Sequence, residues 1–126
     1  MPRTLLVADD ALIIREIIKD LAVGAGWEVV GEASNGQEAI DRYRQLHPDA
    51  VTLDLVMPGH DGLHALHGIM EFDPGAKVLV VSALEQRGVL KDAFKAGAAD
   101  FVSKPFDKQS LQVSLERLFP GAAAPQ

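Results

Sequence analysis

The sequence predicts an α/β fold: a single doubly wound domain whose parallel five-stranded sheet is covered by helices on both faces. Short runs rich in β-branched residues or Leu alternate five times with longer segments of helical pattern along 126 residues. Most of these runs are apolar without polar alternation, as expected of strands buried on both faces. Hydrophobic residues make up 48% of the chain, which is enough to enclose the core of one domain.

The first half of the chain contains three strand patterns and two helix patterns. We expect strands at Thr4–Ala8, Glu28–Glu32 and Ala50–Asp54, and helices at Ala11–Val23 and Gly36–Leu46. Gly24 and Gly26 end the first helix, and Ser34 or Asn35 caps the second. Charges and Gly31 dilute the apolar pattern of the second strand, which predicts an edge strand.

The second half continues the alternation. We expect helices at Gly62–Phe72, Gln86–Ala96 and Asp107–Phe119, and strands at Lys77–Ser82 and Asp100–Ser103. Gly97 is placed to close the fourth helix. The domain is predicted to span residues 1–119, because the tail at 120–126 is Pro, Gly, Ala and Gln with nothing to bury. That tail is either a frayed terminus or a truncated linker.

Composition excludes several classes of protein. The net charge is −6 and no stripe of Lys and Arg is present, which argues against direct binding of nucleic acid. The chain has no cysteine, so neither disulfides nor thiol chemistry hold it together. Its first ten residues contain too short an apolar run for a signal peptide or a membrane span. We therefore expect a cytoplasmic protein that does not enter the membrane.

Polar side chains stand at the carboxyl ends of the predicted strands. Asp9 and Asp10 follow the first strand, Asp54 ends the third, Ser82 ends the fourth and Lys104 follows the fifth. In open parallel sheets, ligands bind at this edge, where the strand order reverses. Three neighbouring carboxylates repel one another unless a cation neutralises them, and Mg²⁺ prefers oxygen ligands. The sequence therefore predicts a magnesium-assisted pocket in which the Asp54 carboxylate can form an acyl phosphate.

Taken singly, these residues have simpler interpretations. Either of the adjacent acids could cap the helix that begins at Ala11, and Asp54 could start a turn. Ser82 could bond a phosphoryl oxygen, but strands often end in Ser. Lys104 could be a solvated surface residue, or its ammonium could pair with Asp54 and then with a phosphoryl group. The peptide bond between Lys104 and Pro105 is a candidate for the cis form.

Together, the motifs resemble the receiver domain of two-component response regulators. They are Asp9-Asp10, Asp54 with Met57-Pro58 and Asp61-Gly62, Ser82-Ala83, and Lys104-Pro105-Phe106, in order between Arg3 and Phe119. Within that family the chain is most similar to stand-alone chemotaxis-type regulators and to the receiver half of the chemotaxis methylesterase. The resemblance implies a flavodoxin-like fold with strand order 2-1-3-4-5.

The resemblance also implies how the pocket is used. Asp54 would accept a phosphoryl group from the phosphohistidine of a sensor histidine kinase or a histidine phosphotransfer domain. Mg²⁺, or Mn²⁺ in its place, would be held by Asp10, Asp54 and the backbone carbonyl of Val56, with Asp9 acting through water.

A switch is implied at the ends of the last two strands. Ser82 and Lys104 would contact the phosphoryl group, and movement of Ser82 would open space for Phe101. Because Phe lacks the hydroxyl of Tyr, its inward burial should cost less free energy; an ordinary core Phe is the alternative. The output face would comprise the helix at 86–96, the strand at 100–103 and the helix at 107–119, and it would bind an effector or form a homodimer.

Two apolar residues depart from many relatives in the family. Val56 lies two residues after Asp54, and Leu84 lies two residues after Ser82. In the family these positions flank the path of the water that hydrolyses the aspartyl phosphate. Apolar side chains offer that water no hydrogen bond, so we expect slow dephosphorylation.

The first helix combines a predicted core face with exposed apolar residues. At about 100° per residue, one face carries four residues expected in the core. They are Ile14, Ile17, Ile18 and Leu21. Leu12 lies nearly opposite that face and Ile13 on its flank. They are either scattered surface residues or, as the family implies, the docking site of the phosphodonor.

Other functions stay open at this point. A phosphohydrolase of the haloacid dehalogenase type would need two Asp residues spaced by two after the first strand, whereas the acids here are adjacent. A flavin-binding module would need a phosphate loop rich in Ser, Thr and Gly, where this chain has two acids. A receiver cut from a larger regulator, with a DNA-binding or enzymatic output domain, is a further alternative.

Overall fold

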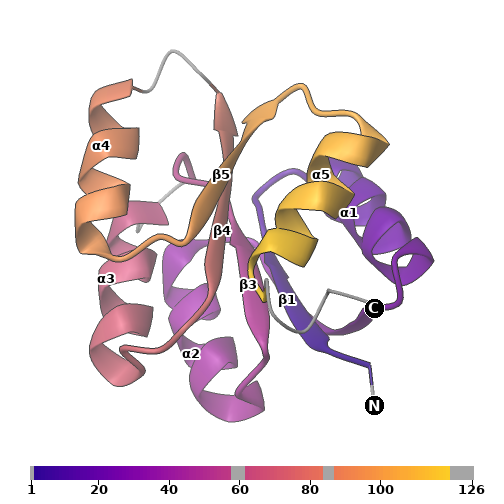
Figure 1. Ribbon diagram of the computed structural model, residues 1–126. Helices are drawn as coiled ribbons and strands as arrows, with labels where there is room; N and C mark the ends of the chain where they lie inside the picture. Colours follow the sequence, from indigo (N-terminus) through magenta and orange to yellow (C-terminus); the bar gives the residue numbers. More distant parts are fainter. Residues whose placement is uncertain (1, 58–61, 84–86, 120–126) are drawn as a thin grey trace.

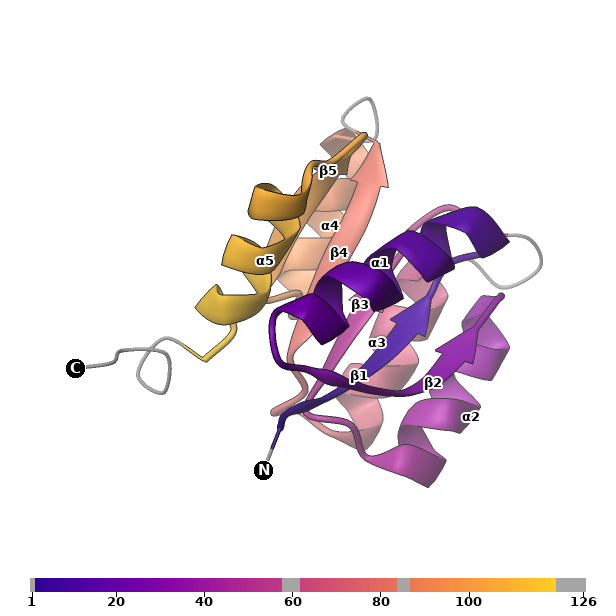
Figure 2. The same ribbon diagram turned by 90° about the vertical axis from the view of Figure 1, so that its right-hand side faces the viewer.

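In the computed structural model, five parallel strands form one sheet, with α1 and α5 on one face and α2, α3 and α4 on the other (Figures 1 and 2). The structure describes residues 2–57, 62–83 and 87–119. The strands are β1 (Thr4–Ala8), β2 (Glu28–Ala33), β3 (Ala50–Leu53), β4 (Val78–Ala83) and β5 (Asp100–Lys104). The helices are α1 (Leu12–Gly24), α2 (Gly36–Leu46), α3 (Gly62–Phe72), α4 (Arg87–Ala96) and α5 (Lys108–Arg117).

The strand order is β2-β1-β3-β4-β5, which confirms the predicted flavodoxin-like fold. β2 lies at an edge of the sheet, as its diluted apolar pattern predicts. The order reverses between β1 and β3. After β1 the chain forms β2 at the edge of the sheet, and it then returns to form β3 on the other side of β1. The carboxyl ends of β1 and β3 therefore lie next to each other, at the position where such sheets bind ligands.

Side chains at the ends of helices account for several boundaries. The Asn35 side chain accepts a 2.9 Å hydrogen bond from the Glu38 backbone N–H and so caps α2, whereas Ser34 bonds the Glu38 carboxylate. Asp107 caps α5 in the same way through Ser110. Gly97, just after α4, has a φ of +116°, which residues with a Cβ rarely adopt.

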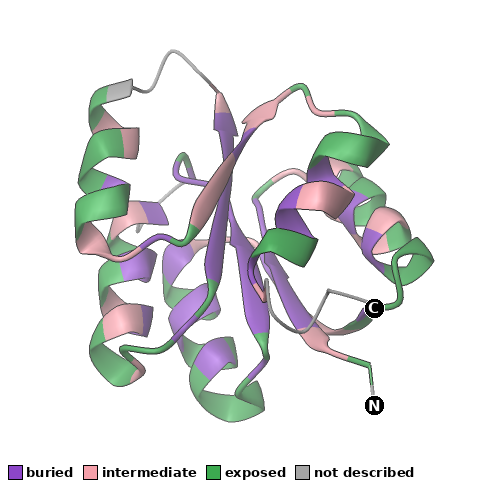
Figure 3. Cartoon of the chain, viewed as in Figure 1, coloured by how far each residue is buried: buried purple, intermediate pink, exposed green. Residues whose placement is uncertain are grey.

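The core consists of two apolar layers, one on each face of the sheet. In Figure 3, the central strands are coloured as buried over most of their length. Leu6, Val51 and Val80 point into the layer under α2, α3 and α4. Leu5 and Leu79 point into the layer under α1 and α5. This alternation buries both faces of the central strands, which is why their sequences show no polar alternation.

One core prediction for the first helix is wrong. Ile17 is 40% exposed, whereas Ile18 and Ala22 are buried, and Ile14 and Leu21 pack partly buried against them. Because the small side chain of Ala22 also faces the sheet, the buried stripe is centred on Ile18. At about 100° per residue, Ile17 then falls at the margin of that stripe.

An aromatic cluster closes the end of the sheet from which the strands begin. The Trp27 and Phe119 rings lie 6.1 Å apart between centroids, and the Arg3 guanidinium lies 4.2 Å from the centroid of Phe119. Trp27 is buried, and it is the only Trp of the chain. The cluster joins the segments before β1, before β2 and after α5.

Four parts of the chain lie outside the described residues: 1, 58–61, 84–86 and 120–126. The predictions about Leu84 and about the tail at 120–126 concern these parts, and they stay predictions. Within the described ranges, no helix combines the length and apolar character needed to cross a bilayer.

Candidate functional site

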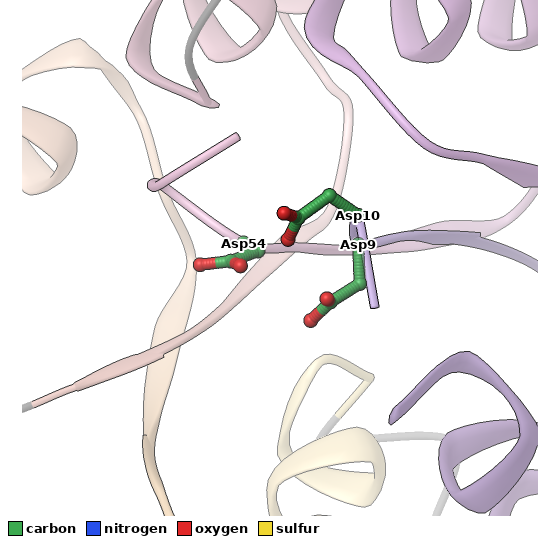
Figure 4. A group of neighbouring side chains, drawn as sticks. All are labelled: Asp9, Asp10 and Asp54. Atoms are coloured by element: carbon green, nitrogen blue, oxygen red, sulfur yellow. The ribbon is translucent and has the colours of Figure 1, made fainter. Parts of the chain in front are cut away.

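Three carboxylates meet at the reversal in strand order (Figure 4). Asp9 and Asp10 leave the end of β1, and Asp54 follows β3, the strand that pairs with β1. One carboxylate oxygen from each residue lies within 4.8 Å of the others. Asp9 and Asp54 are buried, whereas Asp10 is exposed to solvent.

Asp9 is held by hydrogen bonds to its backbone and to its side chain. Its backbone N–H donates to the Ala33 carbonyl on β2, and its Oδ1 accepts a 2.9 Å hydrogen bond from the Ala11 N–H. Its carbonyl accepts a 2.8 Å hydrogen bond from Arg15 Nη1 on α1. The residue that precedes α1 is Ala11, so neither acid is the N-cap residue of that helix.

Lys104 reaches across the sheet to both buried acids. Its Nζ lies 2.7 Å from Asp9 Oδ2 and 3.2 Å from Asp54 Oδ2. The next peptide bond, between Lys104 and Pro105, is cis. The Lys104 ammonium is thus an internal counter-ion for the carboxylates.

Burial and neighbouring charges shift the pKa values of Asp54 and Lys104 in opposite directions. Burial raises the pKa of Asp54, although the Val56 N–H at 3.1 Å from Oδ1 and the charge of Lys104 partly offset that rise. Burial lowers the pKa of Lys104, but the hydrogen bond to Asp9 and the charge of Asp54 outweigh it, so its pKa is raised. Lys104 therefore stays cationic while the acids compete for its charge.

Ser82 and Phe101 lie on the neighbouring strands β4 and β5. Ser82 Oγ is buried and has no hydrogen-bond partner among the described residues. A buried hydroxyl without a partner is unfavourable, which makes it available to a bound group. Phe101 is half-buried and packs against the apolar layer under α4.

Three exposed apolar side chains lie close in sequence to the acids of the cluster. Val56 is 55% exposed, Leu12 is 62% exposed and Ile13 is 66% exposed. Leu12 and Ile13 open α1, one residue beyond the acid pair, and Val56 follows Asp54 by two residues. Their exposure agrees with a docking surface, but their role stays a prediction.

The donor atoms fit a hard divalent cation. All three side chains offer carboxylate oxygens, and the arrangement contains no thiolate or imidazole that would select a softer metal. Ser82 and Lys104 place a hydroxyl on β4 and an ammonium on β5, farther along the same edge. Such a group can bind a cation and an anionic oxygen group side by side.

The charged residues of α1 and β2 that hold the backbone of the acid cluster through hydrogen bonds were not identified from the sequence. Arg15 bonds the Asp9 carbonyl, and its Nε donates a 3.0 Å hydrogen bond to Glu32 Oε1 on β2. Lys19 lies 2.9 Å from the other oxygen of Glu32. The only signal in the sequence is a basic residue among isoleucines on α1, which a solvated helix face explains equally well.

Comparison with protein families supplies the deciding observation. Residues 5–116 match the model of the response regulator receiver domain. The chain belongs to that family. Receiver domains are signalling proteins rather than enzymes in the usual sense.

Curated relatives of this receiver domain include chemotaxis proteins. The chain is 43% identical to the chemotaxis protein CheY of Thermotoga maritima over 118 residues, which are 94% of this chain and 98% of that protein. It is 48% identical to CheY of Listeria monocytogenes over 113 residues, or 90% and 95% of the two chains.

Solved structures of similar fold are also receiver domains. The chain of a CheX–CheY–BeF₃–Mg complex from Borrelia burgdorferi superposes with a TM-score of 0.87 at 32% identity, covering 98% of this chain and 92% of that one. The response regulator domain of Thermotoga maritima CheB gives a TM-score of 0.84 at 31% identity over the whole of both chains.

Proposed function

We propose that this receiver is a phosphorylation-activated signalling switch in the cytoplasm, in which Asp54 carries the phosphoryl group. The observation that supports this most directly is the meeting of three carboxylates with the ammonium of Lys104 at the reversal in strand order. The phosphodonor would be the phosphohistidine of a sensor histidine kinase or a histidine phosphotransfer domain. The similarity to CheY proteins supports a role in chemotaxis.

The acid cluster is proposed to hold Mg²⁺, or Mn²⁺ in its place. Asp10, Asp54 and the backbone carbonyl of Val56 would be its ligands, with Asp9 acting through water. When bound, the ion supplies positive charge that offsets the anionic oxygens of donor and acceptor.

The residues of this chain perform the transfer as acceptor and as charge stabilisers. An Asp54 carboxylate oxygen attacks phosphorus while the bond from phosphorus to the donor imidazole nitrogen breaks, and that nitrogen keeps the electron pair. Lys104, 3.2 Å from Asp54 Oδ2, stabilises the added negative charge. The Ser82 hydroxyl, which has no partner among the described residues, donates to a phosphoryl oxygen.

The proposed switch leads from Ser82 to the face of α4, β5 and α5. Movement of Ser82 toward the phosphoryl group changes the space next to Phe101, which adopts a more buried position. A groove of about 460 Å³ between β5 and α5 is lined in part by Phe101, Phe106 and Arg117. An effector protein, or a second copy of the chain, is proposed to bind this face once it has rearranged.

Leu12 and Ile13 are proposed to form the docking site of the phosphodonor. They are exposed and stand at the start of α1, one residue beyond the acid pair. A partner helix placed there would bury apolar surface while its phosphohistidine reaches Asp54.

Incubation with acetyl phosphate and Mg²⁺ followed by mass measurement of the intact protein tests the proposal. We expect one phosphoryl adduct, which is absent in the Asp54→Asn variant and absent when a chelator removes the metal. Turnover of general phosphate esters without a stable adduct would instead support a phosphohydrolase.

A further inference from the structure

Arg15 on α1 contacts the backbone of the acid pair from outside the cluster. Its Nη1 donates a 2.8 Å hydrogen bond to the Asp9 carbonyl, and its Nε donates a 3.0 Å hydrogen bond to Glu32 Oε1. The Arg15 side chain is only 15% exposed. One guanidinium therefore links α1, β2 and the peptide that joins Asp9 to Asp10.

That peptide determines where the Asp10 side chain begins. The Asp9 carbonyl, the Asp10 N–H and the Asp10 Cα belong to one planar unit, so fixing the carbonyl also fixes the position of the Asp10 Cα. No side chain of the described residues bonds the Asp10 carboxylate, which is exposed. The direction of Asp10 toward Asp54 (Figure 4) thus depends on the backbone behind it.

We propose that Arg15 is a positioning residue for divalent-cation binding at this site. It orients the Asp9–Asp10 peptide so that Asp10 faces Asp54, and the inference rests on the proposed magnesium site. The planar guanidinium donates to a carbonyl and to a carboxylate at a fixed angle, which a Lys ammonium cannot reproduce. Glu32 keeps the guanidinium in place, and Lys19 in turn holds the second oxygen of Glu32.

The positive charge of Arg15 and its positioning role have opposite effects on the affinity of the site for Mg²⁺. A cation near a metal site repels the metal, so loss of its charge alone would strengthen Mg²⁺ binding. Loss of positioning would weaken it. The sign of the change in affinity therefore separates the two effects.

Calorimetric titration with Mg²⁺ compares the unaltered chain with Arg15→Gln, Arg15→Lys and Lys19→Gln. We expect Arg15→Gln to weaken Mg²⁺ binding by about 10- to 100-fold, the range seen for residues that orient metal ligands. The Mg²⁺ affinity of Arg15→Lys should fall between that of the unaltered chain and that of Arg15→Gln. Lys19→Gln is the comparison variant, because Lys19 bonds Glu32 from the same helix without touching Asp9. It acts only through Glu32, so its loss should weaken Mg²⁺ binding much less than the loss of Arg15 does.

Phosphorylation by acetyl phosphate gives a second readout. Arg15→Gln should raise the Mg²⁺ concentration needed for half-maximal rate and leave the rate at saturating Mg²⁺ unchanged. A lower maximal rate with an unchanged half-saturating concentration would contradict a positioning role. Urea unfolding establishes that each variant is folded; if Arg15→Gln is not, Arg15→Lys and Glu32→Gln carry the same comparison.

The remaining outcomes are distinct. Unchanged or tighter binding of Mg²⁺ by Arg15→Gln overturns the inference alone, and so does an equal loss in Lys19→Gln, which would reflect general destabilisation. Failure of the unaltered chain to bind Mg²⁺ overturns the proposed function, and the inference with it.

Discussion

Asp54 combines burial with negative charge, which opposes folding. Its side chain is almost fully enclosed, and burial raises the pKa of the carboxyl above its usual range. A group whose pKa is raised by folding makes the folded state less stable at pH values above that pKa. The ammonium of Lys104 offsets only part of this effect because it also serves Asp9.

Asp54→Asn is therefore expected to stabilise the metal-free protein at pH 7 by about 1–2 kcal/mol. Asn keeps an oxygen that can accept the Val56 N–H and removes the buried charge. Because the folded state takes up the proton more readily than the unfolded chain, the gain should shrink as the pH falls toward about 4. Urea unfolding with a chelator present, from pH 7 down to pH 4, measures the stabilisation at pH 7 and its decrease at lower pH. A variant less stable than the parent at pH 7 would contradict the prediction.

Val56 and Leu84 are expected to prolong the phosphorylated state. Val56 is exposed beside Asp54 and offers an attacking water no hydrogen bond. We expect the aspartyl phosphate of a Val56→Asn, Leu84→Glu double variant to decay about tenfold faster, which corresponds to the free energy of about one hydrogen bond to the water. Decay of the adduct after removal of acetyl phosphate measures this. Equal decay in both proteins would refute it.

At the scale of single elements, β3 carries a polar side chain although all of its residues are buried. Thr52 lies between Val7 on β1 and Leu79 on β4, in the layer under α1 and α5. Its Oγ1 is buried without a hydrogen-bond partner among the described residues. A desolvated hydroxyl of this kind costs stability.

Thr52→Val should raise the free energy of unfolding by about 1 kcal/mol, because it replaces the hydroxyl by a methyl of similar size. Thr52→Ser is the matched control: it keeps the hydroxyl, loses the methyl and should destabilise by about 1 kcal/mol. Urea unfolding of the three proteins tests the pair. A destabilised Thr52→Val would show that the hydroxyl has a bonding partner in solution.

The start of α3 packs directly on the backbone that follows β3. A Cβ at Gly62 would overlap the Asp54 carbonyl oxygen and the Leu55 Cα, neither of which can move without displacing the acid cluster. The close approach also allows the Gly62 N–H to donate to the Leu55 carbonyl at 3.1 Å. Only Gly fits at this junction.

Gly62→Ala is expected to destabilise the protein by about 2 kcal/mol or more and to weaken Mg²⁺ binding, since it pushes α3 away from the Asp54 segment. Gly88→Ala on α4 is the control, because a Cβ there meets nothing within 4 Å. It should be neutral or stabilising by up to about 1 kcal/mol, as Ala favours helix. Unfolding curves and Mg²⁺ titrations of both variants provide the measurement. Equal stability of the two variants would contradict the expected overlap.

For the whole molecule, the alternation of short apolar runs and helical patterns predicted a parallel sheet covered by helices on both faces, whereas the strand order was predicted from the family resemblance. Parallel order then brings the ends of β1, β3 and β5 to one edge, so the gathering of Asp9, Asp54 and Lys104 follows from topology. The shared contact of Lys104 with both acids does not follow, because it depends on side-chain conformations. Arg15 was overlooked for the same reason, and Ile17 because the small Ala22 shifts the buried stripe of α1.

Magnesium is expected to stabilise the entire domain, since its proposed ligands come from the ends of two central strands. At a Mg²⁺ concentration about ten times the dissociation constant, the gain in the free energy of unfolding should be about 1.4 kcal/mol. Thermal unfolding followed by circular dichroism, with and without Mg²⁺, measures this. Asp54→Asn should show a much smaller shift, and an equal shift in both proteins would place the ion elsewhere.

The contact between the Trp27 and Phe119 rings lies at the opposite end of the strands from the acid cluster. Because Trp27 is the only Trp of the chain and is buried, its fluorescence reports whether the chain is folded. It would be a poor sensor of what the pocket holds. Observing occupancy optically requires a chromophore introduced near the other end of the sheet.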